Sequence, residues 1–217
     1  MTAFNVYVTP NAAHIFSDGA HFDRSHDMAI IGFGSKVVPL MPYPAAVGAT
    51  GKAFIPNLIG TALADIKFAS FDDMLSGFPD VVQAFIHHAK AHVGDWGTFR
   101  AGLVGWSPAE DRPMLSIIES DGTTVAAPTQ LEQYFDPPIQ GTFNLNTNNP
   151  AETGLKLLEQ QRLLRGRERG SASDRTFHGV GGFAQHTIIT KDSIEMRVLK
   201  TWPEDKIGQH IMPERAG

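Results

Sequence analysis

The first fifty residues carry short apolar runs with the alternation and composition of β-strands. Residues 4–9 (FNVYVT) and 13–17 (AHIFS) are rich in β-branched and aromatic side chains, and Pro10-Asn11 separates them. Three further runs, bounded by Gly and Pro, predict strands over residues 28–34, 35–41 and 45–49. The chain is therefore predicted to begin with a block of five short strands.

Beyond residue 51 the apolar spacing becomes helical. Apolar side chains at 54, 55, 58, 59, 63 and 66 share one helix face and predict a helix over residues 52–66, despite Pro56 and Gly60. Ser70 and Asp73 have the spacing of a capping box, which predicts a second helix to about residue 91, interrupted near residues 77–79. Asn149 and Pro150 predict the start of a third helix, which runs to about residue 165.

Strands are predicted again on both sides of the third helix. Two precede it, over residues 99–106 and 113–120, and a closing hairpin follows over residues 182–190 and 193–202. The polar stretch 165–175 is predicted to be an exposed loop. Strands in contiguous blocks favour antiparallel sheets with helices outside them. The order predicts an α+β fold, a four-layer α/β/β/α sandwich in a single domain over residues 1–217.

Composition narrows the classes of protein that remain. Hydrophobic residues make up 42% and charged residues 19%, which is typical of a globular protein. The net charge of -5 argues against a nucleic-acid partner, and no apolar run reaches the roughly 18 residues that span a membrane. The chain lacks cysteine and a secretory-type N-terminus, so we expect a cytoplasmic protein without disulfides or thiolate chemistry.

Four residues are candidates for a catalytic site. If the initiator Met1 is removed, Thr2 carries a hydroxyl and a free α-amino group, which together form a nucleophile and its base. Asp18 ends the second predicted strand, and a hairpin with the first strand returns it to the chain start. Lys36 lies in the run K-V-V-P-L, and Gly51 closes the turn G-A-T-G before the first helix.

In this order, the four motifs resemble the proteasome-like N-terminal nucleophile (Ntn) hydrolases, including the bacterial ATP-dependent peptidase subunit. The resemblance covers residues 2–66 by motif and the remainder by element order. It implies a threonine-type amide hydrolase or peptidase with Thr2 as nucleophile. It also implies that Lys36 lowers the proton affinity of the Thr2 amine, Asp18 holds Lys36, and the Gly51 amide stabilises the oxyanion. Peptide or amide substrates and a homo-oligomeric ring follow from the resemblance as well.

The chain departs from the family near its last hairpin. Active members carry an Asp and a Ser shortly before a Gly-Gly pair, whereas residues 176–182 read TFHGVGG, with His178 in that stretch. The alternative is a catalytically inactive subunit that serves as a structural or assembly component, for example of a phage or prophage particle.

Other motifs do not support a cofactor or metal. Gly51 and Lys52 lack the remaining positions of a phosphate-binding loop. His88 and His92 have the i, i+4 spacing of zinc ligands without the Glu of H-E-x-x-H, which favours a solvated helix face. No G-x-S-x-G motif indicates a serine hydrolase. We therefore expect no cofactor and no metal.

Overall fold

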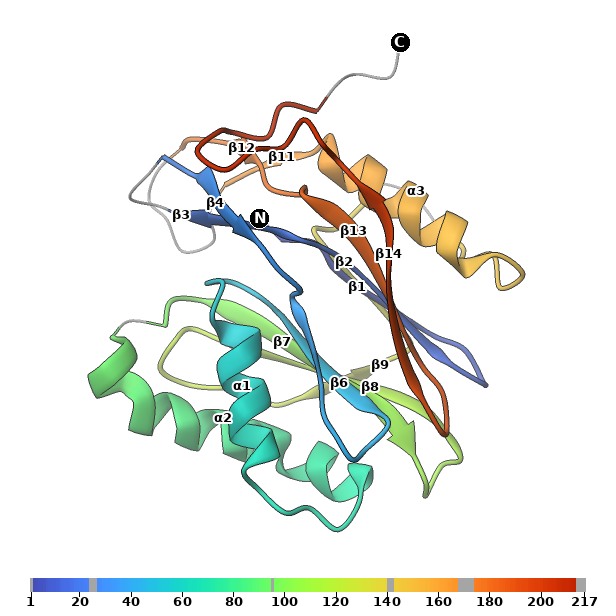
Figure 1. Cartoon of the computed structure of the whole chain (residues 1–217). Helices are drawn as coiled ribbons and strands as arrows, with labels where there is room; N and C mark the ends of the chain where they lie inside the picture. Colours follow the sequence, from blue (N-terminus) through green and yellow to red (C-terminus); the bar gives the residue numbers. More distant parts are fainter. Residues whose placement is uncertain (1, 24–26, 95, 140–142, 168–173, 214–217) are drawn as a thin grey trace.

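The computed structural model describes residues 2–23, 27–94, 96–139, 143–167 and 174–213; Met1 and part of the predicted loop over 165–175 lie outside these ranges. Two five-stranded antiparallel sheets face each other at its centre (Figure 1). The β1 sheet consists, in spatial order, of β10 (Gln133–Asp136), β1 (Phe4–Val8), β2 (Ala13–Asp18), β13 (Phe183–Ile189) and β14 (Ile194–Thr201). The β7 sheet consists of β5 (Val37–Pro39), β6 (Ala45–Thr50), β7 (Phe99–Ser107), β8 (Arg112–Ser120) and β9 (Thr129–Leu131).

Two small hairpins and three helices complete the described part of the chain. The hairpins pair β3 (Ala20–Asp23) with β4 (Ala29–Phe33), and β11 (Arg165–Gly166) with β12 (Phe177–His178). The helices are α1 (Ile55–Ala64), α2 (Phe71–Val93) and α3 (Pro150–Arg162). Figure 1 shows α1 and α2 against the outer face of the β7 sheet and α3 against the outer face of the β1 sheet.

The predicted fold class, an α+β four-layer α/β/β/α sandwich, is wrong. In the described part of the chain, fourteen strands in four sheets outweigh three helices, so the fold is mainly β. Among the described helices, α3 covers the β1 sheet, where it contacts β2, β13 and β14. Most of β14 remains exposed despite that contact. One 13-residue helix therefore does not make a layer over this sheet.

The space between the two sheets is filled by apolar side chains from both. Phe4 of β1 projects onto the β7 sheet, where a Cβ at Gly48 would lie 2.2 Å and one at Gly102 2.7 Å from its ring atoms. Val6 and Ile15 from the β1 sheet and Leu115 from the β7 sheet complete this layer. The two glycines are thus required because the Phe4 ring lies directly on the backbone of β6 and β7.

α2 and α3 begin where the sequence predicts, whereas α1 begins at Ile55 rather than at residue 52. The Ser70 hydroxyl accepts a hydrogen bond from the amide of Asp73 at the start of α2, and the Asn149 side chain accepts one from the amide of Glu152 at the start of α3. The interruption predicted within the second helix is absent, because α2 continues through Pro79. Phe71, Met74 and Phe78 on its first turns are buried against the β7 sheet, and this packing outweighs the hydrogen bond that proline removes.

Candidate functional site

Asp18 is the centre of the candidate site. Its carboxylate is fully buried at the end of β2 and accepts four hydrogen bonds. Oδ1 accepts from Lys36 Nζ at 2.7 Å and from the Ala3 amide at 2.8 Å. Oδ2 accepts from the amides of Ala20 at 3.2 Å and Gly181 at 3.0 Å. One carboxylate therefore ties the chain start to the segments that carry Lys36 and Gly181.

Lys36 lies immediately before β5 and is almost completely buried. Burial lowers the pKa of its ammonium below the usual value, and the neighbouring Asp18 carboxylate acts in the opposite direction. The ion pair and hydrogen bond to Asp18 compensate for the loss of hydration. The contact between Lys36 and Asp18 that the motifs predict is thus present in the structure.

Thr2 is half-buried and lies next to this ion pair through the backbone. Its peptide bond to Ala3 supplies the amide that Asp18 Oδ1 accepts, the same oxygen that binds Lys36 Nζ. Because one oxygen holds both donors, Thr2 is connected to the buried cation through Ala3 and Asp18. The structure thus brings together Asp18, Lys36 and the backbone next to Thr2, which are three of the four predicted residues.

Gly51, the fourth, lies on the opposite sheet at the end of β6. Its φ of 137° is in the region that favours glycine, and a Cβ there would lie 2.8 Å from the Cβ of Phe99. Thr50 immediately before it donates a hydrogen bond to the Asp136 carboxylate at 2.9 Å, which fixes the strand end to β10. Gly51 is therefore held in a backbone conformation that other residues rarely adopt, across the sheet interface from Asp18.

His21, a titratable residue that the sequence analysis did not select, stands beside the ion pair. Burial and then the positive charge of Lys36 lower the pKa of the His21 imidazole, while Asp18 and a hydrogen bond with the Gly34 backbone raise it. The net direction is downward, so the ring is neutral near pH 7. No motif identifies His21, because its position near Lys36 depends on the β3–β4 hairpin, which brings the chain back to residue 34.

The stretch 176–182 supports Asp18 through its backbone. The Gly181 amide donates to Asp18, whereas His178 Nδ1 lies 3.1 Å and 3.2 Å from the carbonyl oxygens of Arg162 and Leu164. His178 is therefore engaged at the end of α3 and does not replace the missing Asp and Ser near Thr2.

A buried ion pair between Arg162 and Asp205 fixes this glycine turn. Arg162 donates to both oxygens of Asp205, at 2.7 Å and 2.8 Å, and Asp205 Oδ2 in turn accepts from the Gly182 amide at 2.6 Å. Arg162 also donates to the carbonyl of Val180 at 3.0 Å. The turn that contacts Asp18 is thus fixed between α3 and the segment after β14.

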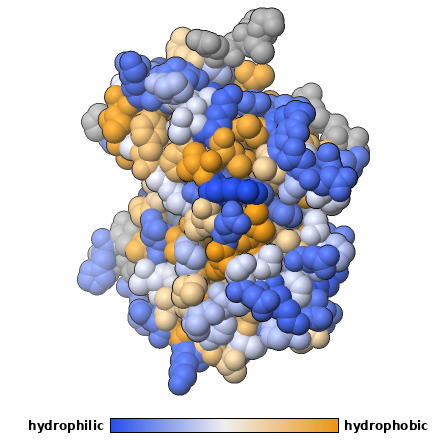
Figure 2. Space-filling model, turned by 45° about the vertical axis from the view of Figure 1, so that its right-hand side comes forward, coloured by the Kyte–Doolittle hydropathy of each residue, from blue (hydrophilic) through white to orange (hydrophobic). Residues whose placement is uncertain are grey.

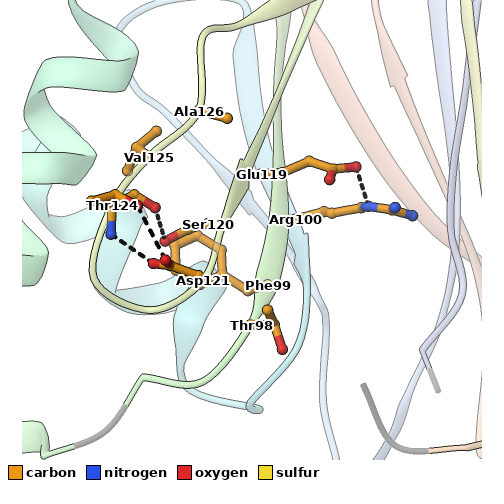
Figure 3. A pocket seen from close by; sticks show the side chains of 9 residues that line it. All are labelled: Thr98, Phe99, Arg100, Glu119, Ser120, Asp121, Thr124, Val125 and Ala126. Carbon is orange, nitrogen blue, oxygen red and sulfur yellow. Dashed lines mark hydrogen bonds and ion pairs between the residues drawn. The ribbon is translucent and has the colours of Figure 1, made fainter. Parts of the chain in front are cut away.

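A pocket of about 260 Å³ opens near the Gly51 end of the β7 sheet (Figure 3). Phe99, whose Cβ lies next to the Gly51 backbone, is one of its walls. Arg100 and Glu119 point toward each other across neighbouring strands and form an ion pair, and Asp121 bonds to Thr124 in the following loop. The pocket therefore offers charged side chains of both signs beside the predicted oxyanion residue.

The two histidines with zinc-like spacing lie on an exposed face of α2. His88 and His92 are exposed, as expected for a solvated helix face, and His88 bonds to the carbonyl of Ala84. Within the described ranges, no group of three or more His, Cys, Asp or Glu side chains is arranged to hold a metal ion.

A second histidine site lies on the α3 side of the β1 sheet. His14 Nδ1 and His186 Nε2 are 3.0 Å apart, and the His186 ring stacks on Phe16 at 4.5 Å. Burial is the main cause that lowers the pKa of both imidazoles, to about 3 for His186; the charges of the neighbouring histidine and of Arg197 add to it there. Both rings are therefore neutral at pH 7, and one donates to the other.

Lowering the pH from 7 to 4 is expected to destabilise the fold through this pair. Histidines in the unfolded chain take up protons below pH 6.5, whereas His186 in the folded chain takes one up only near pH 3. Between these two values, the free energy of unfolding therefore decreases as the pH is lowered. The slope is at most about 1.4 kcal/mol per pH unit for each imidazole. Thermal melts of the wild-type protein and of His186→Gln between pH 7 and pH 4 measure this pH dependence. Equal pH dependence in the two proteins would contradict the assignment.

Comparison of the sequence with protein-family models and with curated proteins finds no match. The resemblance to the Ntn hydrolases therefore remains a prediction that rests on the motifs and on the geometry around Asp18. As regards membranes, none of the helices in the described ranges has both the length and the apolar character needed to span one.

Proposed function

We propose that the protein is an N-terminal threonine hydrolase of amide or peptide bonds, with Thr2 as its nucleophile after removal of Met1. The observation that carries the proposal is the shared oxygen of Asp18. It accepts from Lys36 Nζ and from the amide that follows Thr2, in a buried position. Burying a lysine costs free energy, and this one shares its acceptor oxygen with the amide that follows the residue that would carry the free amine.

The chemistry is an acyl transfer in two steps. The Thr2 hydroxyl attacks the substrate carbonyl carbon while its proton passes to the α-amine, whose ordinary pKa is about 7.7–8.0. The positive charge of Lys36 lowers that pKa further. The C–N bond breaks as the leaving nitrogen takes the proton, and water then hydrolyses the ester on Thr2. The amide of Gly51 is the proposed donor to the oxyanion.

Thr2→Ala is expected to abolish covalent labelling by an epoxyketone or a β-lactone. Intact-mass spectrometry of the wild-type protein should give a chain that begins at Thr2 and gains one inhibitor mass. Thr61→Ala is the control, because Thr61 is an exposed residue of α1 whose hydroxyl bonds only to the Asn57 carbonyl among the contacts described. A purified protein that retains Met1, or labels equally without the Thr2 hydroxyl, would refute the proposal.

The second candidate is a catalytically inactive structural or assembly component. The specific observation in its favour is that His178 Nδ1 lies within hydrogen-bond distance of the carbonyls of Arg162 and Leu164 at the end of α3 instead of supporting the Thr2 amine. The same mass measurement separates the candidates, because an inactive component does not require the removal of Met1 and forms no adduct.

A further inference from the structure

β14 is the longest strand with an open edge among the described residues. It has eight residues, whereas the other edge strands β5, β9 and β10 have three, three and four. Most of its side chains are exposed. Figure 2 shows a side face of the molecule on which apolar surface is interrupted by hydrophilic side chains. A long strand with unpaired backbone groups is a template for a further strand.

The backbone groups on this open edge follow from the hairpin geometry. Thr190 donates to the Ser193 carbonyl across the turn, which makes these two residues a hydrogen-bonded pair. In an antiparallel ladder such pairs alternate, so Glu195 and Arg197 direct their backbone groups toward β13. Ile194, Met196 and Val198 therefore direct theirs away from the sheet, toward any incoming strand.

The side chains of β14 are arranged symmetrically about Met196. Glu195 and Arg197 lie on one face, with side chains 62% and 44% exposed, and their charged groups are 3.8 Å apart within the strand. Ile194 and Val198 lie two residues away on the other face, and Val198 is 55% exposed. In an antiparallel pair of two such strands centred on Met196, Glu195 of each copy faces Arg197 of the other. Ile194 faces Val198 in the same register.

In the neighbouring registers, Ile194, Met196 and Val198 still direct their backbone groups toward the partner strand, but the opposite charges no longer face each other. Centring on Arg197 places the two Arg197 side chains opposite each other, and centring on Glu195 places two carboxylates together. Charged side chains usually protect an open edge from pairing. Here one register places two opposite-charge pairs in the close, non-hydrogen-bonded positions, where each such pair contributes roughly 0.2–1 kcal/mol.

We infer that a second copy of this chain pairs with β14 edge to edge, antiparallel about Met196, so that the two β1 sheets become one ten-stranded sheet. The pairing is isologous and closes as a two-fold dimer. It also covers the exposed side chains of Met196 and Val198, which are 37% and 55% exposed. The inference does not rest on the proposed hydrolase activity.

Charge exchange tests the interface. Sedimentation of the wild-type protein should show a dimer, and Glu195→Arg or Arg197→Glu alone should raise its dissociation constant at least about tenfold, since like charges then face each other. The double exchange Glu195→Arg with Arg197→Glu restores both pairs and should restore the dimer. A monomeric wild-type protein, or a double variant as weak as the single ones, would overturn the inference.

Disulfide formation tests the register, since the chain has no cysteine of its own. Met196→Cys places two thiols on a hydrogen-bonded pair with Cα atoms about 5.5 Å apart, which is within the range of a disulfide. A covalent dimer should form on oxidation. Val198→Cys is the matched control, because its thiols lie about 13 Å apart in this register and should remain free. Cross-linking of the Val198→Cys protein without that of Met196→Cys would exclude the register, even if the charge variants fail to fold.

Discussion

Asp18→Ala is expected to lower the free energy of unfolding by about 3–5 kcal/mol, the usual loss when one member of a buried ion pair is removed. The substitution leaves the Lys36 ammonium buried without its counter-charge, and it removes the side-chain acceptor of the Ala3 and Gly181 amides. Denaturant unfolding of the purified variant measures the change. The matched control is Lys191→Met, since Lys191 forms an equally short ion pair with Asp111 at the surface, where solvent replaces the contact.

A double-mutant cycle separates the ion pair from the amide contacts. Lys36→Met removes the buried charge while keeping the length of the side chain, and Asp18→Asn removes the opposite charge while keeping one acceptor oxygen. The double variant is expected to lose less stability than the sum of the two single variants, because neither charge is then left alone. Strict additivity would show that Lys36 and Asp18 contribute independently, against the geometry described above.

The contact between Lys36 and Asp18 was predictable because it depends on neighbouring segments. Asp18 ends a strand that forms a hairpin with the chain start, and Lys36 follows the short strands β3 and β4, immediately before β5. The hairpin signals placed Asp18 near the chain start, and the resemblance to the Ntn hydrolases implied that it holds Lys36. The catalytic roles of Thr2, Lys36 and Gly51 remain predictions, since a contact does not establish a reaction.

The fold class was not predictable from the same signals. β10 forms because it pairs with β1, with Phe4 opposite Asp136, and β9 forms because it pairs with β8. Neither segment has the apolar alternation that identifies a strand by itself, so the sequence underestimated the share of strand. The closing hairpin has that alternation, and it appears as β13 and β14 close to the predicted bounds.

Buried polar groups paired over long sequence distances were also beyond local patterns. His14 and His186 are 172 residues apart, and each resembles an ordinary strand residue within its own segment. Arg162 resembles a surface cation near the end of an amphipathic helix, yet it is almost completely buried. Only the packing of α3 against the β1 sheet and the C-terminal segment places it there.

Arg162→Lys is therefore expected to be strongly destabilising, by about 3–5 kcal/mol, despite the conserved charge. The guanidinium bonds both oxygens of Asp205, reaches Glu204 at 3.0 Å and the Val180 carbonyl, and lies 4.7 Å from the centre of the Trp202 ring. A lysine ammonium cannot make this set of contacts from one atom. Lys200→Met is the control, because Lys200 of β14 forms an exposed ion pair with Glu159 of α3, the helix that carries Arg162.

The effect of Arg162→Lys should extend to the candidate site. Asp205 accepts from the Gly182 amide, and the adjacent Gly181 amide donates to Asp18, which also binds the Ala3 amide. Hydrogen exchange of the Gly182, Gly181 and Ala3 amides should accelerate in the variant under conditions where most of the protein is folded, because the turn between α3 and β13 loses its support. Faster exchange at Gly182 with unchanged exchange at Ala3 would show that Asp18 keeps the chain start in place without the buried ion pair behind it.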